Sequence, residues 1–205
     1  MLWEVPYLPL DPKDIGRTYE AIIRVNSQSG KGGVAYVLEN EYGVQMPKSM
    51  HVEFGKIINQ LADEVGVELT SSQIYNAFDE TYLSLEKPFK LESFRTETTL
   101  GDDGESAVTC VSYISANGEP HELLSKGNGP IDAFVKGLQE ELVPEFSIMD
   151  YLQHTMGEGS DASSIAYVQI ETPSGASFFG SAKDTNIEVA SVKAVLCAVN
   201  RAFGS

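Results

Sequence analysis

The sequence predicts an α+β fold: a small helical subdomain followed by two βββα units packed around a pseudo-twofold axis. Two observations predict it. Apolar residues recur at helical spacing before residue 87, and the order strand, strand, strand, helix then occurs twice. One βββα unit leaves a sheet face bare, so two units should cover each other. We expect a linker arm and helical subdomain at 1–86 and a second domain at 87–205, divided into 87–143 and 144–205.

Composition excludes several classes of protein. The chain has 205 residues, 42% of them hydrophobic, and a net charge of −16. Nucleic-acid binding is excluded because the 14 basic residues form no stripe that could displace counterions from phosphates. No apolar run approaches the roughly 20 residues of a membrane span, and the N-terminus does not resemble a secretory signal. We expect a cytoplasmic protein whose two cysteines, Cys110 and Cys197, are buried thiols.

The first part of the chain is expected to begin irregularly. Three prolines in the first twelve residues predict an irregular arm. Residues Thr18 to Val25 read as a strand and Asn26 to Gly33 as a loop, whereas Gly33 to Leu38 fits a helix or a strand equally well.

Two helices are expected next. Apolar residues step by three and four after Pro47, which is typical of an amphipathic helix. A second helix is expected to be capped by Ser71 or Ser72, with Ile74 and Phe78 on one face.

The remaining chain contains the repeated pattern. The first unit is expected to have strands over 89–100, 106–115 and 119–125, with a tight hairpin at Asn117-Gly118 and a helix from Pro130. The second unit is expected to have strands over 145–156, 164–172 and 177–183 and a helix over 186–203. That last helix carries a stripe of small and apolar residues at Ile187, Ala190, Ala194 and Ala198.

The sequence carries few residues in an arrangement typical of catalysis. No histidine has metal-ligand spacing, and His51 and His121 are interpreted as solvated surface residues. Asp150 and His154 share one strand face and could form a carboxylate–imidazole pair, but no nucleophile motif accompanies them. The segment Ser29-Gly30-Lys31-Gly32-Gly33 departs from a phosphate loop and is interpreted as a mobile turn or a weak anion nest.

The segment from Lys126 to Ala133 is the most informative. Two glycines allow close backbone approach just before a helix, where free amides and the helix dipole favour a carboxylate. A zwitterionic amino acid fits such a place, although a simple strand-to-helix turn explains the pattern equally well.

Several strings resemble the C-terminal portion of the 2-isopropylmalate synthases. The strings W-E-V-P-Y-L-P at residues 3–9 and N-S-Q-S-G-K-G-G-V-A-Y at 26–36 resemble the subdomain after the catalytic barrel of that family. The string G-N-G-P-I-D-A at 127–133 and the pattern of Ala190, Ala194, Ala198 and Asn200 resemble its regulatory domain. The resemblance covers essentially the whole chain.

The resemblance implies a homodimer that binds L-leucine as a feedback inhibitor. The ligand's polar end would meet backbone at Gly127, Asn128, Gly129 and Asp132. Its aliphatic end would lie among Ile131, Ile148, Tyr151, Thr155, Ala162, Ser164 and Ile187. Because Thr155 and Ser164 stand where alanine is expected, ligand preference is open, and a citramalate or homocitrate synthase sensing another amino acid is an alternative.

The resemblance also implies what other parts of such an enzyme would do. The divalent metal and the acetyl-CoA chemistry belong to a catalytic barrel partner absent from this sequence, so no cofactor and no catalysis are expected here. A purely structural dimerisation domain is a second alternative, and an enzyme using Asp150, His154 and Lys31 is a third.

Strand geometry adds one expectation. Ile148 and Tyr151 fall on opposite faces of an ideal strand. For both to line one pocket, the strand must bulge near Met149-Asp150, or two chains must build the pocket.

Overall fold

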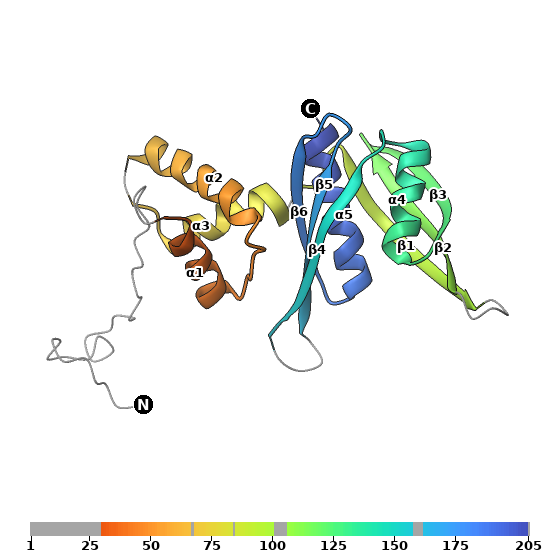
Figure 1. Ribbon diagram of the computed structural model, residues 1–205, viewed down its shortest axis with the longest axis horizontal. Helices are drawn as coiled ribbons and strands as arrows, with labels where there is room; N and C mark the ends of the chain where they lie inside the picture. Colours follow the sequence, from red (N-terminus) through yellow and green to blue (C-terminus); the bar gives the residue numbers. More distant parts are fainter. Residues whose placement is uncertain (1–29, 67, 84, 101–105, 158–161, 205) are drawn as a thin grey trace, which may run out of the picture.

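The chain forms a helical subdomain and two three-stranded antiparallel sheets, each followed by a helix (Figure 1). The computed structural model describes residues 30–66, 68–83, 85–100, 106–157 and 162–204. The helical subdomain consists of α1 (Gly30–Tyr42), α2 (Met50–Val65), α3 (Ser71–Phe78) and the π-helical turn η2 (Asp79–Leu83). The first unit consists of β1 (Phe89–Leu100), β2 (Ser106–Ala116), β3 (Glu119–Gly127) and α4 (Pro130–Glu141). The second consists of β4 (Ser147–Met156), β5 (Ser163–Glu171), β6 (Ser177–Asp184) and α5 (Ile187–Phe203). The α+β prediction with two βββα units is confirmed.

Helix α1 corrects one expectation and decides another. Residues 30–33 were expected in a loop or anion nest, yet they form the first turn of α1, and the ambiguous stretch 33–38 is helical. Glycine disfavours helix, but the side chains of Val34, Val37 and Leu38 are buried, and this packing outweighs the local preference. The expected strand over 18–25 lies outside the described residues.

The cap of α3 lies one residue earlier than expected. Thr70, rather than Ser71 or Ser72, has extended backbone geometry and accepts a hydrogen bond from the Gln73 amide. The Gln73 side chain in turn accepts from the Thr70 amide at 2.9 Å, completing a capping box.

Among the described residues no helix is long and apolar enough to cross a membrane.

The expected hairpin at Asn117-Gly118 is present, with φ of 52° and 90°, as a tight two-residue turn requires.

The two units repeat the same strand irregularity. The register of β1 against β2 shifts between Leu91 and Ser93, and that of β4 against β5 shifts between Ile148 and Asp150. The shared bulge aligns the repeats: Leu91 corresponds to Ile148.

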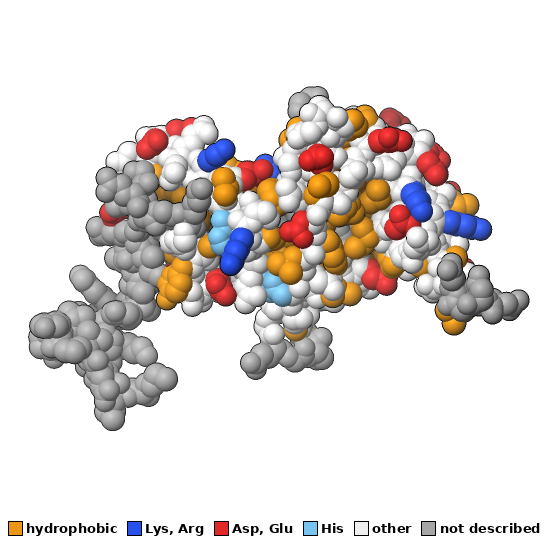
Figure 2. All heavy atoms as spheres, in the orientation of Figure 1, with side chains coloured by type: hydrophobic (Ala, Val, Ile, Leu, Met, Phe, Trp, Pro, Cys, Tyr) orange, Lys and Arg blue, Asp and Glu red, His pale blue; other side chains and the backbone are white. Residues whose placement is uncertain are grey.

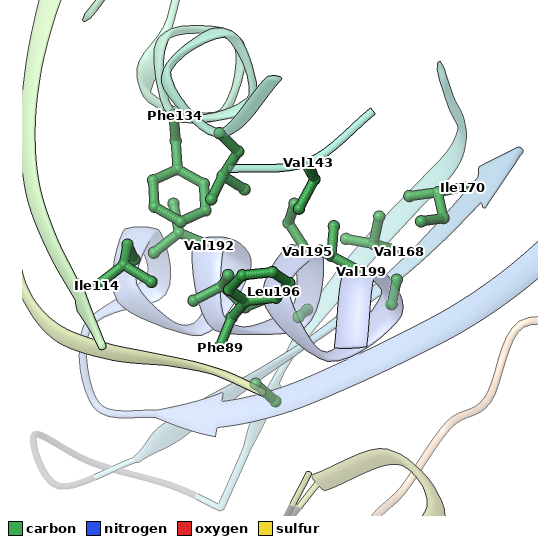
Figure 3. Close-up of a cluster of buried hydrophobic side chains, with 14 of the residues drawn as sticks. Phe89, Ile114, Phe134, Val143, Val168, Ile170, Val192, Val195, Leu196 and Val199 are labelled. Carbon is green, nitrogen blue, oxygen red and sulfur yellow. The ribbon is translucent and has the colours of Figure 1, made fainter. Parts of the chain in front are cut away.

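The two units share one hydrophobic core. Helices α4 and α5 lie between the sheets (Figure 1), and Figure 3 shows Phe134 of α4 pointing towards Val192 of α5. Helix α5 packs so closely on β6 that a Cβ at Gly180 would lie 2.2 Å from the Ala194 carbonyl oxygen. The small-residue stripe on α5 therefore permits close packing of a helix on a strand.

The two sheets differ on their outer faces. Ile165, Tyr167 and Phe179 of the second sheet pack into the core of the helical subdomain, so this sheet is covered on both sides. The corresponding face of the first sheet leaves Tyr113 and Leu124 exposed. The helical subdomain therefore breaks the symmetry of the two units.

Helix α5 joins the second unit to the helical subdomain. Arg201 pairs with Glu53 of α2 at 2.8 Å, lies over the Tyr82 ring and donates to the Phe179 carbonyl. The Asn200 amide holds the start of β1 by accepting from the Phe89 N–H and donating to its carbonyl. The C-terminal end of α5 is thus fixed to three parts of the fold.

Candidate amino-acid-binding site

The turn from β3 into α4 is shaped by close packing at Gly127. A Cβ at this position would lie 2.4 Å from Asp132 Oδ2 and 2.5 Å from the Ala133 backbone nitrogen. Only glycine lets the chain pass the helix start at this distance. The positive φ values of the described glycines occur elsewhere. Glycine is therefore required at position 127 because there is no room for a Cβ atom, and not because the backbone has a positive φ.

The Asp132 carboxylate stabilises the turn through hydrogen bonds. Its Oδ2 accepts hydrogen bonds from the Asn128 backbone N–H at 2.9 Å and from Lys136 Nζ at 2.8 Å. The pKa of Asp132 lies below its ordinary value, chiefly because Lys136 donates to the carboxylate and also because Asn128 does. The Asn128 amide is therefore already engaged inside the turn.

Gly129 faces open space. It is the N-cap of α4, with extended backbone geometry (φ −164°, ψ 171°), and no side chain caps the helix. A Cβ built there meets nothing within 4 Å. The equivalent N-cap of α5, Asn186, instead accepts from the amides of Glu188 and Val189. Of the two equivalent helix starts, only that of α4 lacks a capping side chain.

A second group of expected residues lies on β4 and β5. The bulge at Met149 confirms the first of the two arrangements anticipated for Ile148 and Tyr151, because the extra residue turns both side chains to one face. Thr155 lies on the same face as Tyr151 and pairs directly with Ser164 of β5. Ala162 immediately precedes β5 and is half-buried.

The Tyr151 side chain connects β4 to α5. Its hydroxyl lies 2.7 Å from Ser191 Oγ and also contacts the Gln153 side chain. Ile187 lies one turn before Ser191 on α5, and its carbonyl accepts a hydrogen bond from Ser191 Oγ at 2.6 Å. In the first unit the corresponding pair is Phe94 and Phe134, whose rings pack edge to face at 6.0 Å. A polar, partly exposed contact thus replaces an aromatic core contact.

The structure therefore brings the expected residues together in two groups. Residues 127–132 belong to the first unit, while those on β4, β5 and α5 belong to the second. Among the described residues no hydrogen bond or ring contact joins the groups. Both present apolar surface: Tyr151 and Ile187 are 36% and 42% exposed, and Ile131 and Ile148 are half-buried. Figure 2 shows hydrophobic side chains gathered where Figure 1 places β4 and α4.

Two of the three histidines, His51 and His154, have structural contacts. His154 Nε2 accepts from the Gln45 backbone N–H and lies 3.2 Å from the Tyr167 hydroxyl, so the ring links β4 to the helical subdomain rather than to Asp150. His51 Nε2 lies 3.1 Å from the Met46 carbonyl oxygen. His51 and His121 are half-buried, more enclosed than expected. Within the described ranges no cluster of His, Cys, Asp and Glu could hold a metal.

Both cysteines are free and buried, as expected. Burial raises the pKa of each thiol to about 11, because the thiolate is poorly solvated there. Neither cysteine is therefore a candidate nucleophile.

Sequence reasoning missed several contributors to this region. Ser191 and Gln153 were not predicted as partners of the Tyr151 hydroxyl, because no motif marks them. The alignment of the two units through their bulges would have paired Ser191 with Phe134, but that alignment needs the strand register.

These features define a class of α+β module in which two βββα units enclose a shared core. Comparison with known proteins then specifies it. Residues 68–203 match the family described as the LeuA allosteric (dimerisation) domain, and residues 1–39 match the alpha-isopropylmalate synthase post-catalytic domain-like family. The chain therefore belongs to the LeuA allosteric domain family.

Curated relatives agree with this assignment. The chain is 44% identical to 2-isopropylmalate synthases of Rhodospirillum rubrum, over 97% of its length, and of Agrobacterium fabrum and Thermobifida fusca, over 98% each. It covers 35%, 36% and 34% of these relatives, about a third of their length. The chain corresponds to their C-terminal regulatory part.

Proposed function

We propose that this chain senses L-leucine and transmits feedback inhibition to the catalytic barrel of a 2-isopropylmalate synthase. In that proposal the barrel joins acetyl-CoA to 2-oxoisovalerate, uses the divalent metal, and works in the cytoplasm. The present chain supplies no catalytic step. The observation that carries the proposal is the open space at Gly129, beside a helix start that no side chain caps.

The chemistry of the surroundings suits a zwitterion with an aliphatic side chain. The uncapped amides of α4 favour a carboxylate, and the Asn128 carbonyl and Asp132 can attract an ammonium group. The aliphatic end requires apolar walls, which Ile131, Ile148 and Ile187 can provide.

We further propose that β4 forms a homodimer interface. It is an edge strand that leaves Met149 and Leu152 exposed, at 55% and 43%. A ten-residue edge with exposed apolar side chains is a ready surface for a second chain. Across such an interface, the loop group of one chain could complete the strand group of its partner.

Thr155 and Ser164 favour a second candidate function. Two hydroxyl-bearing residues pair directly across β4 and β5, where alanine was expected. A ligand with a shorter or more polar side chain would suit them, as in a related citramalate or homocitrate synthase.

Thermal unfolding with a panel of amino acids separates these functions. Leucine at about 100 times its dissociation constant should stabilise the fold by roughly 2.7 kcal/mol, while lysine and glutamate should not. A larger shift with isoleucine or valine would favour the second function. No shift with any of them would leave only a structural dimerisation domain.

A further inference from the structure

A separate cavity lies where the helical subdomain meets the two βββα units. Its volume is about 190 Å³. We call it the joint cavity, because it is bounded by the segment after η2, the start of β1, the end of β6 and one side of α5. Its lining consists of Leu83, Leu85, Glu86, Phe89, Lys90, Leu91, Ala182, Lys183, Lys193, Leu196 and Cys197.

One part of the joint cavity wall is apolar. Leucine and phenylalanine side chains supply most of this part, together with Ala182 and Cys197. Cys197 donates to the Tyr82 carbonyl, and burial raises its pKa to about 11, so it remains a neutral thiol. A ligand here would be held without covalent chemistry.

The charged residues of the lining are mostly cationic. Lys90, Lys183 and Lys193 contribute to it, against one acidic residue, Glu86. This is notable in a chain with 14 basic and 30 acidic residues and a net charge of −16. Lys193 is paired with Asp184 at 2.8 Å. Lys90 lies between two carboxylates, at 3.9 Å from Glu86 and 3.7 Å from Glu92.

Lys183 differs from the other two lysines of the lining in its contacts. Its ammonium group donates to the Tyr75 hydroxyl at 2.9 Å and lies 4.9 Å from the centre of that ring. Within the described ranges it has no carboxylate partner, although the residue is half-buried. A partly desolvated cation gains more from an added anion than a solvated one does.

We propose that the joint cavity binds a short aliphatic carboxylate, independently of the amino-acid site. An apolar cavity of roughly 150 Å³ can hold benzene, so this volume suits a ligand of on the order of six to eight non-hydrogen atoms. The aliphatic part lies on the leucine walls, and the carboxylate supplies the counter-charge at the lysines. An inorganic anion would leave the walls unused, and the lysines repel an amine.

Such a ligand would contact the helical subdomain and both βββα units at once. Because it bridges three parts of the fold, its binding would stabilise their relative arrangement. The joint cavity is therefore a second place where a small molecule can act on the regulatory part.

Methyl NMR of the 205-residue chain with 4-methylpentanoate tests the proposal. We expect saturable shifts at millimolar concentration in the methyl groups of Leu83, Leu91 and Leu196. The uncharged isostere 4-methylpentanamide should bind at least tenfold more weakly. Added salt should weaken the binding of 4-methylpentanoate, because it screens the attraction between the carboxylate and the lysines. Inorganic phosphate should produce no shifts there.

Matched variants identify the charges. Lys183→Met and Lys193→Met should each weaken binding several-fold, while Lys126→Met, an exposed lysine on β3, should not. Retained methyl spectra show whether each variant is folded, and the carboxylate–amide comparison requires no variant. Equal binding of the amide would overturn the proposal. So would shifts confined to Ile131, Ile148 and Ile187, or no shifts up to about 50 mM.

Discussion

At the scale of single residues, the two glycines of the β3–α4 turn have opposite roles. Gly127 is packed against the start of α4, whereas Gly129 faces open space. Gly129→Val should therefore fold normally and still fill the proposed ligand space. We expect it to abolish stabilisation by leucine while its ligand-free melting temperature stays near wild type. Differential scanning calorimetry measures both quantities.

Gly127→Ala is the matched control. Its methyl group would lie 2.5 Å from the Ala133 backbone nitrogen, so the turn or the helix must move. We expect a loss of about 1–3 kcal/mol in ligand-free stability, as is typical of overpacking. Wild-type leucine affinity in Gly129→Val would show that the loop is only a turn.

Tyr151 supports a second residue-level prediction. Its ring is partly exposed and its hydroxyl meets Ser191, so it should be a wall of the site rather than core filler. Tyr151→Ala should weaken leucine binding by roughly 1–3 kcal/mol. It should cost the ligand-free fold less than the roughly 3–5 kcal/mol typical of a buried aromatic. Urea unfolding with and without leucine gives both values.

The internal repeat supplies the comparison for Tyr151. Phe94 occupies the equivalent position in the first unit and packs on Phe134. Phe94→Ala should therefore destabilise the ligand-free fold more than Tyr151→Ala, and it should leave leucine affinity nearly unchanged. The reverse order of stabilities, with Tyr151→Ala still binding leucine normally, would mean that Tyr151 is core.

At the scale of elements, α5 is the connection between the second unit and the helical subdomain. Arg201→Met removes the ion pair with Glu53 and the hydrogen bond to Phe179, in a region where both charged side chains are mostly enclosed. We expect the free energy of unfolding to fall by about 1–3 kcal/mol. Lys193→Met, on the same helix, breaks a more exposed pair and should cost less than about 1 kcal/mol. Equal effects in urea titrations would show that the Arg201 contacts do not stabilise this joint.

The sequence predicted elements best where a periodic pattern coincided with clear end signals. The bounds of β1 and the hairpin at Asn117-Gly118 were correct because alternation and turn chemistry agree there. The start of α1 was not, since its glycines are held in a helix by buried residues whose partners are distant in sequence. The cap of α3 was misplaced by one residue because Thr70, Ser71 and Ser72 can all cap a helix.

The candidate site was less accessible to sequence reasoning. The turn at 127–130 could be found because glycines mark it, and the bulge at Met149 was anticipated as one of two ways to bring Ile148 and Tyr151 together. The Tyr151–Ser191 contact could not be predicted, because it depends on how α5 lies across the sheet. The pairing of Asn128 with Asp132 was also missed, since it forms only when the turn has its final shape.

At the scale of the whole molecule, the proposed dimer predicts a surface-specific effect. Met149 lies at the bulge of β4 and is 55% exposed. Met149→Asp should shift the chain towards monomer, because a carboxylate is costly in an apolar interface. Leu124→Asp places the same charge on the outer face of the first sheet, where the wild-type side chain is 65% exposed, and should leave the oligomeric state unchanged. Sedimentation velocity over a range of concentrations measures both. A monomeric wild type, or equal behaviour of the two variants, would rule out this interface.

Titration calorimetry of the wild-type chain with L-leucine shows directly whether this chain is a leucine sensor. We expect saturable binding with one site per chain, because of the two equivalent helix starts, those of α4 and α5, only that of α4 lacks a capping side chain. We also expect Gly129→Val to give no binding heat under the same conditions. Two sites per chain would show that the α4 helix start is not the sole determinant of binding. The absence of any binding heat with millimolar leucine, for a folded wild-type protein, would show that the chain does not sense leucine.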